Sequence, residues 1–276
     1  MRCEPITDFS IRLGESPVWH NGLLYFADID SARVFAYDPA RRKCHIRQLP
    51  DEVGSLVPRA AGGLVLAMRD GFYAYDFATQ RREPLAAPVH RQRGVKFNDS
   101  KCDPCGRLYA GTTGPAGQAH LYVLQPDRRV QCLLGGVTIS NGIAFSLDGR
   151  TLYYADTPTR RVDAFDNDRA TGALSNRRTV IEVSRGLPDG MCLDGQGLLW
   201  VAQWGGGCVQ RYDPATGAAL ERIDLPADLV SSCAFGGADL STLFVTTARQ
   251  PGQPGNGAVY ALRPGVRGLP TACYRG

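Results

Sequence analysis

The sequence predicts an all-β fold, a six-bladed β-propeller, because two strand patterns recur along the whole chain. Segments such as L-Y-F-A, L-Y-Y-A and L-W-V-A return every 40 to 47 residues, beginning at Leu24, Leu64, Leu108, Leu152, Leu199 and Leu243. A second pattern, V-F-A-Y-D in its first copy, follows each of them, beginning at Val34, Phe72, Leu121, Val162, Val209 and Val259. A period of about 44 residues with about four strands per unit is typical of propeller blades. HEAT repeats of similar length are helical, and this sequence has no sustained helical periodicity.

The predicted strands follow from short apolar runs that lie between Asp, Gly and Pro turns. The fourth unit, Thr138–Asp166, is the clearest, with three such runs separated by D-G and P-T turns. The other units open at G-E-S-P, which contains Glu15, at Ser55, at V-K-F-N-D-S, at L-P-D-G and at S-S-C-A-F-G-G.

Six units account for nearly all of the 276 residues, so we expect one domain over residues 1–276. The N-terminal segment Arg2–Asp8 contains C-E-P-I, which echoes R-E-P-L at Arg82–Leu85, where an outermost strand is expected. We therefore expect the N-terminal segment to supply the outer strand of the last four-stranded antiparallel blade. Such closure removes the exposed sheet edges of an open ring.

Composition excludes several classes of function. Lys and Arg number 31 against 27 Asp and Glu, and no basic run exceeds a few residues, so we expect no nucleic-acid partner. No apolar run of about 18 residues and no apolar leader is present, so we expect neither membrane insertion nor secretion. Nine cysteines, an odd number scattered over several blades, fit reduced thiols in a cytoplasmic protein.

The residues that open the units form the candidate site. In a propeller the first strand of each blade lines the central channel, so these residues gather around one axis. Counting back nine to eleven positions from each anchor leucine gives Glu15, Ser55, Asn98 with Asp99, Asn141, Asp189 and Ser232.

Carboxylate and carboxamide oxygens dominate this set, and such ligands suit a hard divalent cation, calcium or magnesium first, manganese or zinc next. A cation would also relieve the repulsion between converging carboxylates. The alternative is local turn chemistry, since Asn141-Gly142 and the P-D-G at Asp189 are good turn formers. Turn chemistry does not explain why the residues share one phase of the repeat.

Two further features leave alternatives open. Cys102 and Cys105 have the spacing of a redox or zinc pair, but they bracket a D-P turn without a second pair nearby, which favours a structural role. Trp204, which precedes three glycines, fits either the core or the wall of a pocket.

Taken together, G-E-S-P-V-W, F-N-D-x-K-x-D-P-x-G-R, I-S-N-G-I-A-F-S-L-D, L-P-D-G-M-C-L-D and S-S-C-A-F-G-G resemble the senescence marker protein (regucalcin)/gluconolactonase family over essentially the whole chain. The resemblance implies a six-bladed propeller that hydrolyses sugar lactones with one divalent cation in the central channel. It implies that Glu15, Asn141 and Asp189 are the metal ligands. Asn98 and Asp99 would then face the substrate.

Two departures from the family pattern bear on the substrate. Lys96 stands where the family member compared has Arg, and the acidic substrate contact expected after the next G-T is absent from G-T-T-G-P-A-G-Q. We therefore expect a sugar other than the one preferred by animal members, such as a pentonolactone. Lys96 itself is expected to contact the substrate, to pair with Asp99, or to form a structural salt bridge.

The implied reaction is hydrolysis of an aldonolactone to the aldonic acid. The cation would polarise the carbonyl oxygen, and Asp189 is the candidate general base. Calcium is the expected ion, with zinc, magnesium, manganese or ferrous iron as other occupants. Two other readings stay open: a metal-dependent hydrolase of phosphotriesters, and a non-catalytic calcium-binding propeller.

Overall fold

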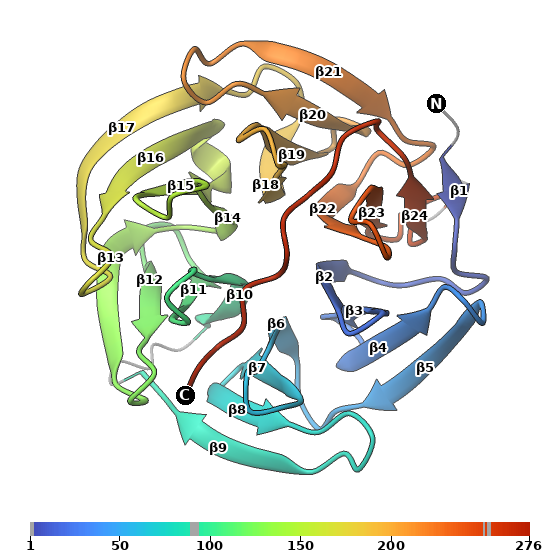
Figure 1. Cartoon of the computed structure of the whole chain (residues 1–276), viewed down its shortest axis with the longest axis horizontal. Helices are drawn as coiled ribbons and strands as arrows, with labels where there is room; N and C mark the ends of the chain where they lie inside the picture. The colour runs from blue at the N-terminus through green and yellow to red at the C-terminus, as the bar shows by residue number, and fades with distance from the viewer. Residues whose placement is uncertain (1–2, 89–93, 251, 253–254) are drawn as a thin grey trace.

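The computed structural model describes residues 3–88, 94–250, 252 and 255–276. Within them, six four-stranded antiparallel sheets are arranged as blades around a central axis (Figure 1). Apart from a single 3-10 turn, η1 (Thr157–Thr159), the regular elements in this part of the chain are strands. The six-bladed propeller predicted from the repeat is confirmed.

Each blade runs from an inner strand at the axis to an outer strand at the rim. Blade 1 consists of β2 (Gly14–His20), β3 (Leu23–Asp28), β4 (Arg33–Asp38) and β5 (Lys43–Gln48). Blade 2 consists of β6 (Val53–Pro58), β7 (Leu64–Met68), β8 (Gly71–Tyr75) and β9 (Arg82–Ala86). Blade 3 consists of β10 (Lys96–Cys102), β11 (Leu108–Thr113), β12 (Ala119–Leu124) and β13 (Val130–Val137).

The second half of the ring repeats this order. Blade 4 consists of β14 (Ser140–Phe145), β15 (Thr151–Asp156), β16 (Arg161–Asn167) and β17 (Leu174–Glu182). Blade 5 consists of β18 (Leu187–Leu193), β19 (Leu199–Trp204), β20 (Cys208–Tyr212) and β21 (Ala219–Asp224). Blade 6 consists of β22 (Val230–Gly236), β23 (Thr242–Thr247), β24 (Val259–Leu262) and β1 (Glu4–Pro5).

The ring closes through the N-terminal strand, as the C-E-P-I echo predicted. Glu4 pairs with Ala261 and Pro5 with Tyr260, so β1 is the outer strand of blade 6. Proline lacks an N–H donor and is tolerated on an edge strand, where one side of the backbone needs no partner. The first and last parts of the chain are thereby joined in one sheet.

The hydrophobic core is divided into six clusters, one at each seam between neighbouring blades. At the seam between blades 5 and 6, for example, the buried rings of Trp200 and Phe235 meet edge to face with centroids 5.9 Å apart. Successive side chains of a strand point to opposite faces of the sheet, and apolar side chains lie on both faces. Each blade therefore packs against a neighbour on both sides. This packing fixes the inner strands relative to one another and so positions whatever they carry.

A C-terminal strap, residues 263–276, crosses the centre of the ring beyond β24 (Figure 1). Gly268 N donates to Leu240 O at 2.8 Å, Thr271 Oγ1 donates to Trp19 O at 2.7 Å, and Tyr274 N donates to Pro58 O at 2.9 Å. These contacts tie the strap to blades 6, 1 and 2 at the end of the channel where the inner strands finish. The repeat pattern did not predict this segment.

Candidate active site

Each of the six inner strands breaks its register with its neighbour near its beginning. The irregularities lie between Glu15 and Val18, Val53 and Ser55, Phe97 and Ser100, Asn141 and Ile143, Pro188 and Met191, and Val230 and Ser232. A β-bulge turns the affected side chains away from the alternation of a regular strand. All the opening residues predicted from the sequence lie within or beside these bulges, which explains their shared phase.

The glycines that follow two of these residues have a packing role. A Cβ added to Gly142 would lie 2.6 Å from Asp189 O, and one added to Gly190 would lie 2.9 Å from Ser232 Cα. Only glycine therefore allows blades 4, 5 and 6 to approach so closely at the axis. Asn141-Gly142 and Asp189-Gly190 lie in strands β14 and β18, so they are not the turn dipeptides of the alternative interpretation.

Four polar residues at these bulges are buried to the same degree. Glu15, Asp99, Asn141 and Asp189 each expose only 5% of their surface. Carboxylates are almost never buried to this extent unless they are paired or bind a metal ion. Blades 1, 3, 4 and 5 therefore place near the axis a group of buried oxygens that needs hydrogen-bond donors or a cation.

Burial raises the pKa of all three carboxylates, and neighbouring carboxylates add to the effect at Glu15 and Asp189. Burial raises the pKa of Glu15 to about 8, and the charge of Asp99 adds to the effect. Burial raises the pKa of Asp189 well above its usual range, with further contributions from Glu15 and Asp99. Burial also raises the pKa of Asp99. Charge effects of Asp99 on Glu15 and Asp189, and of Glu15 on Asp189, indicate that these groups lie in one region of the channel.

One oxygen of Asp189 has no hydrogen-bond partner in the part of the chain that the structure describes. Its Oδ1 is buried and accepts no hydrogen bond from any described residue. A buried acceptor without a donor is costly unless an ion or water satisfies it. This oxygen and the surrounding acidic groups fit a hard cation, which would lower the free energy of the ionised carboxylates.

A cation at this point would need the amide oxygen as well. No three His, Cys, Asp or Glu side chains of the described residues are close enough to form a metal site by themselves. Glu15 and Asp189 would therefore have to be completed by Asn141, whose oxygen is a suitable ligand for calcium. The residues present therefore fit a divalent cation if Asn141 supplies the third ligand.

The side-chain amide of Asn141 forms hydrogen bonds with Asn98 and with Thr157. Asn98 Nδ2 donates to Asn141 Oδ1 and to Ser140 O, each at 2.9 Å. Asn141 Nδ2 in turn donates to Thr157 Oγ1 at 2.9 Å. The amide oxygen of Asn141 has a second lone pair beside the one that accepts from Asn98. Asn98 and Asn141 are thus brought together as predicted, and Thr157 is an added partner.

Lys96 lies at the beginning of β10 but turns to blade 2. Its Nζ is 3.2 Å from Glu52 Oε2, and Glu52 also pairs with Arg69. Of the three roles expected for Lys96, the salt bridge is the one formed here, with Glu52 in place of Asp99. Glu52 was not found from the sequence, because no repeat pattern marks it.

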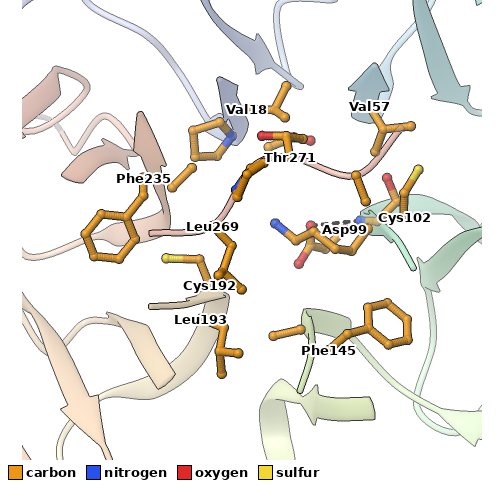
Figure 2. A pocket seen from close by; sticks show the side chains of 18 of the residues that line it. Val18, Val57, Asp99, Cys102, Phe145, Cys192, Leu193, Phe235, Leu269 and Thr271 are labelled. Carbon is orange, nitrogen blue, oxygen red and sulfur yellow. Dashed lines mark hydrogen bonds between the residues drawn. The ribbon is translucent and has the colours of Figure 1, made fainter. Parts of the chain in front are cut away.

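A small cavity continues along the axis from Asp99 to the C-terminal strap. It encloses about 170 Å³ and is walled by apolar side chains such as Val57, Phe145 and Phe235 (Figure 2). Lys101 lines it together with Asp99, and its positive charge lowers the pKa of Asp99 and of Glu15. Alternation along F-N-D-S-K was the one sequence signal that could have revealed Lys101.

The structure places the two cysteines and the tryptophan for which the sequence left alternatives open. Cys102 is buried at the end of β10 and lines the cavity, whereas the Cys105 thiol contacts Arg169 O at 3.5 Å. Trp204 ends β19 and is half-buried outside the hydrophobic clusters, so it does not belong to the core.

Comparison with known proteins agrees with the resemblance. Residues 13–249 match the family model described as "SMP-30/Gluconolactonase/LRE-like region". The chain belongs to this family. Regucalcin from Xenopus laevis is 39% identical, covering 100% of this chain and 99% of its own.

No helix in the described parts of the chain is long and apolar enough to cross a bilayer.

Two solved structures of family members show the same architecture. A calcium-binding protein, regucalcin, from Agrobacterium tumefaciens superposes with a TM-score of 0.93 at 28% identity, covering 99% of this chain and 97% of its own. A gluconolactonase from Xanthomonas campestris superposes with a TM-score of 0.78 at 25% identity, covering 95% and 89%. The first of these proteins is described as calcium-binding and the second as a gluconolactonase.

Proposed function

We propose that this protein hydrolyses a sugar lactone to the aldonic acid with one divalent cation held by Glu15, Asn141 and Asp189. The observation that carries the proposal is the burial of Glu15, Asp99 and Asp189 near the beginnings of three inner strands, with Asp189 Oδ1 lacking a hydrogen-bond partner among the described residues. A site of this kind is poorly stable without a positive charge. The family relationship supplies the class of reaction.

Calcium is the proposed ion, because the donors are carboxylate and amide oxygens without His or Cys. Magnesium, manganese, zinc and ferrous iron are other candidates. When bound, such an ion polarises a carbonyl oxygen as a Lewis acid. The raised pKa values of Glu15 and Asp189 mean that binding must displace protons from the site, so affinity increases with pH.

In the proposed mechanism, Asp189 accepts a proton from the water that attacks the lactone carbonyl carbon. The bond between that carbon and the ring oxygen then breaks, and the ring oxygen takes up a proton to become a hydroxyl group. An ionised Asp189 is required for the first step, so activity should increase with pH up to the apparent pKa of the group.

Asn98 and Asp99 are proposed to orient the hydroxyl groups of the sugar. The C-terminal strap covers the end of the channel where the inner strands finish, so the substrate would approach the end where they begin. Lys96 is engaged there in an ion pair with Glu52, so its amine does not point freely into solvent toward an anionic substituent. A neutral pentonolactone or hexonolactone fits this surface better than a lactone with an anionic substituent.

A screen of lactones tests the proposal. Metal-stripped protein, reloaded with each candidate ion in turn, should release acid from at least one pentono-, hexono- or deoxyhexonolactone faster than its spontaneous opening. Glu15→Gln and Asp189→Asn should abolish that rate without loss of fold. If calcium binds but no lactone is consumed, the protein is a calcium-binding propeller. If only phosphotriesters are hydrolysed, it belongs to the other hydrolase class.

A further inference from the structure

The hydroxyl group of Thr157 joins two of the proposed metal ligands. Its Oγ1 donates to Pro188 O at 2.9 Å, next to Asp189, and accepts from Asn141 Nδ2 at 2.9 Å. Thr157 is 5% exposed, so water does not replace these partners readily. One side chain in blade 4 thereby bridges the opening residues of blades 4 and 5.

The direction of these bonds fixes the orientation of the Asn141 amide. A hydroxyl group has one hydrogen, and Thr157 gives it to the Pro188 carbonyl. Only the NH2 end of Asn141 can then face Thr157, and the oxygen end must point toward Asn98. A flipped amide would set two acceptors against each other at Thr157 and two donors at Asn98.

Thr157 is itself held firmly. It begins the 3-10 turn η1, and its backbone N–H donates to Ile139 O at 3.0 Å. The carboxylate of the preceding residue, Asp156, accepts from the N–H groups of Thr138 and Ile139. The turn between β15 and β16 is therefore anchored over the beginning of β14, where Asn141 lies.

We propose that Thr157 is a positioning residue that presents the amide oxygen of Asn141 to the cation. This inference rests on the proposed function. Removal of a residue that hydrogen-bonds to a metal ligand typically changes metal affinity by about 10- to 100-fold. Loss of the hydroxyl group should therefore weaken cation binding although Thr157 itself is not a ligand.

Thr157→Val tests this, because valine keeps the shape and removes the hydroxyl group, while Thr157→Ser is the matched control. Calorimetric titration with calcium should show roughly tenfold weaker binding for the Val variant and near-normal binding for the Ser variant. Thr157→Ala offers a second hydroxyl deletion should the Val variant not fold. Equal affinity in the Val, Ala and Ser variants overturns the inference.

The same titration separates this inference from the proposed function. Glu15→Gln and Asp189→Asn should abolish binding whatever Thr157 does. If those two variants lose calcium and the Thr157 deletions do not, only the positioning role is wrong. If the Glu15 and Asp189 variants bind calcium normally, the proposed site is wrong.

A separate observation concerns two thiols at the seam between blades 5 and 6. The Sγ atoms of Cys192 on β18 and Cys233 on β22 are 3.7 Å apart. The two strands approach closely in this region, since a Cβ on Gly190 would lie 2.9 Å from Ser232 Cα. A disulfide bond is about 2.05 Å long, so the two sulfur atoms must approach by about 1.7 Å to form one.

The two thiols differ in access. Cys192 is half-buried and lines the axial cavity (Figure 2), whereas Cys233 is fully buried with its Sγ 3.4 Å from Trp200 O. The contact with Cys192 and burial raise the pKa of Cys233, so Cys233 is the poorer nucleophile. A small oxidant that enters the cavity meets Cys192 first.

We infer that Cys192 and Cys233 form a modification site for hydrogen peroxide or a small hydroperoxide. The Cys192 thiol takes one oxygen from the peroxide and becomes a sulfenic acid, with release of water or an alcohol. The Cys233 thiol then attacks that sulfur, a second water leaves, and a disulfide joins β18 to β22. Two thiols are oxidised by one peroxide.

Peptide mapping after a short treatment of the folded, reduced protein with hydrogen peroxide tests this inference. The expected product is a linked peptide pair containing Cys192 and Cys233, two hydrogens lighter than the reduced pair. Cys233→Ser should instead leave a sulfenic acid on Cys192 that dimedone traps. Oxidation of exposed Cys132 while both seam thiols stay reduced, or pairing of Cys192 with another cysteine, overturns it.

Discussion

Asn98 of blade 3 and Asn141 of blade 4 share a hydrogen bond of 2.9 Å across the seam between their inner strands. Asn98 Nδ2 also donates to Ser140 O, so one amide group satisfies two acceptors of the next blade. The bond joins a residue proposed to contact the sugar to a residue proposed to bind the cation. Changes at Asn98 should therefore affect both stability and cation binding.

Asn98→Ala should lower the free energy of unfolding by about 1–3 kcal/mol, because two acceptors lose their donor. Asn98→Asp should destabilise the metal-free protein at least as much, since a carboxylate would then face those acceptors. Urea denaturation of both variants without metal measures the effect. An Ala variant as stable as the unmodified protein would show that the bond is not made in solution.

The buried carboxylates predict an unusual pH dependence of the metal-free protein. The pKa of Glu15 is about 8 in the folded chain, against roughly 4.3 in an unfolded one. Between these values the folded state keeps a proton that the unfolded state has lost. The stability contributed by Glu15 is therefore present at low pH and decreases as pH increases toward 8, by at most about 1.4 kcal/mol per pH unit.

Urea denaturation from pH 5.5 to 8.5 in the presence of a chelator measures this contribution as the difference between the unmodified protein and Glu15→Gln. Calcium should reverse the trend, because its stabilising effect increases as protons leave the site. Parallel pH profiles of the two proteins would contradict the raised pKa.

Lys101 should favour a divalent over a trivalent cation in the site. Its amine lowers the pKa of Glu15 and Asp99, so it acts on the site from within the cavity. Two unit charges about 10 Å apart interact by roughly 1.7 kcal/mol at an effective dielectric constant of about 20. Lys101→Met should therefore increase the affinity for terbium relative to calcium by roughly tenfold.

Lys101→Arg, which keeps the charge, is the control for this comparison, and luminescence of bound terbium measures the affinity. A terbium-to-calcium ratio that is the same in the Met and Arg variants would rule out an electrostatic role for Lys101.

The C-terminal strap should contribute strongly to stability through Tyr274. This side chain is fully buried between blades 2 and 3, and its hydroxyl group donates to Gln125 O at 2.8 Å. Tyr274→Ala should cost about 3–5 kcal/mol in unfolding free energy. Tyr274→Phe, which loses only the hydrogen bond, should cost about 0.5–1.5 kcal/mol.

Thermal and urea unfolding of both variants measure these costs, and Leu269→Ala, a partly exposed strap residue, is the surface comparison. Equal, small effects in all three would mean that the strap does not stay docked in solution.

The repeat of strand patterns predicted most of the fold because each blade must bury the same faces against its neighbours. The anchors from Leu24 to Leu243 all lie in second strands, and the N-terminal segment closes the ring as expected. The strap escaped prediction because residues 263–276 are held by backbone bonds to several blades and follow no repeat.

The opening residues of the candidate site were also predictable, since ring closure brings one phase of the repeat to the axis. Thr157, Glu52 and Lys101 were not predicted. Thr157 and Glu52 act through contacts across seams that only the folded ring creates. Lys101 follows the motif residue Asp99 by two positions, and its importance depends on the buried carboxylates of Asp99 and Glu15, whose pKa values it lowers.

The cation site itself is tested most directly by counting bound calcium. Metal-stripped protein, titrated calorimetrically with calcium at pH 8, should bind one ion per chain. Glu15→Gln, Asn141→Ala and Asp189→Asn should each abolish that binding or weaken it severely while the propeller stays folded. Undiminished binding in all three variants, or no binding of any divalent ion by the unmodified protein, would contradict a metal centre built from these residues.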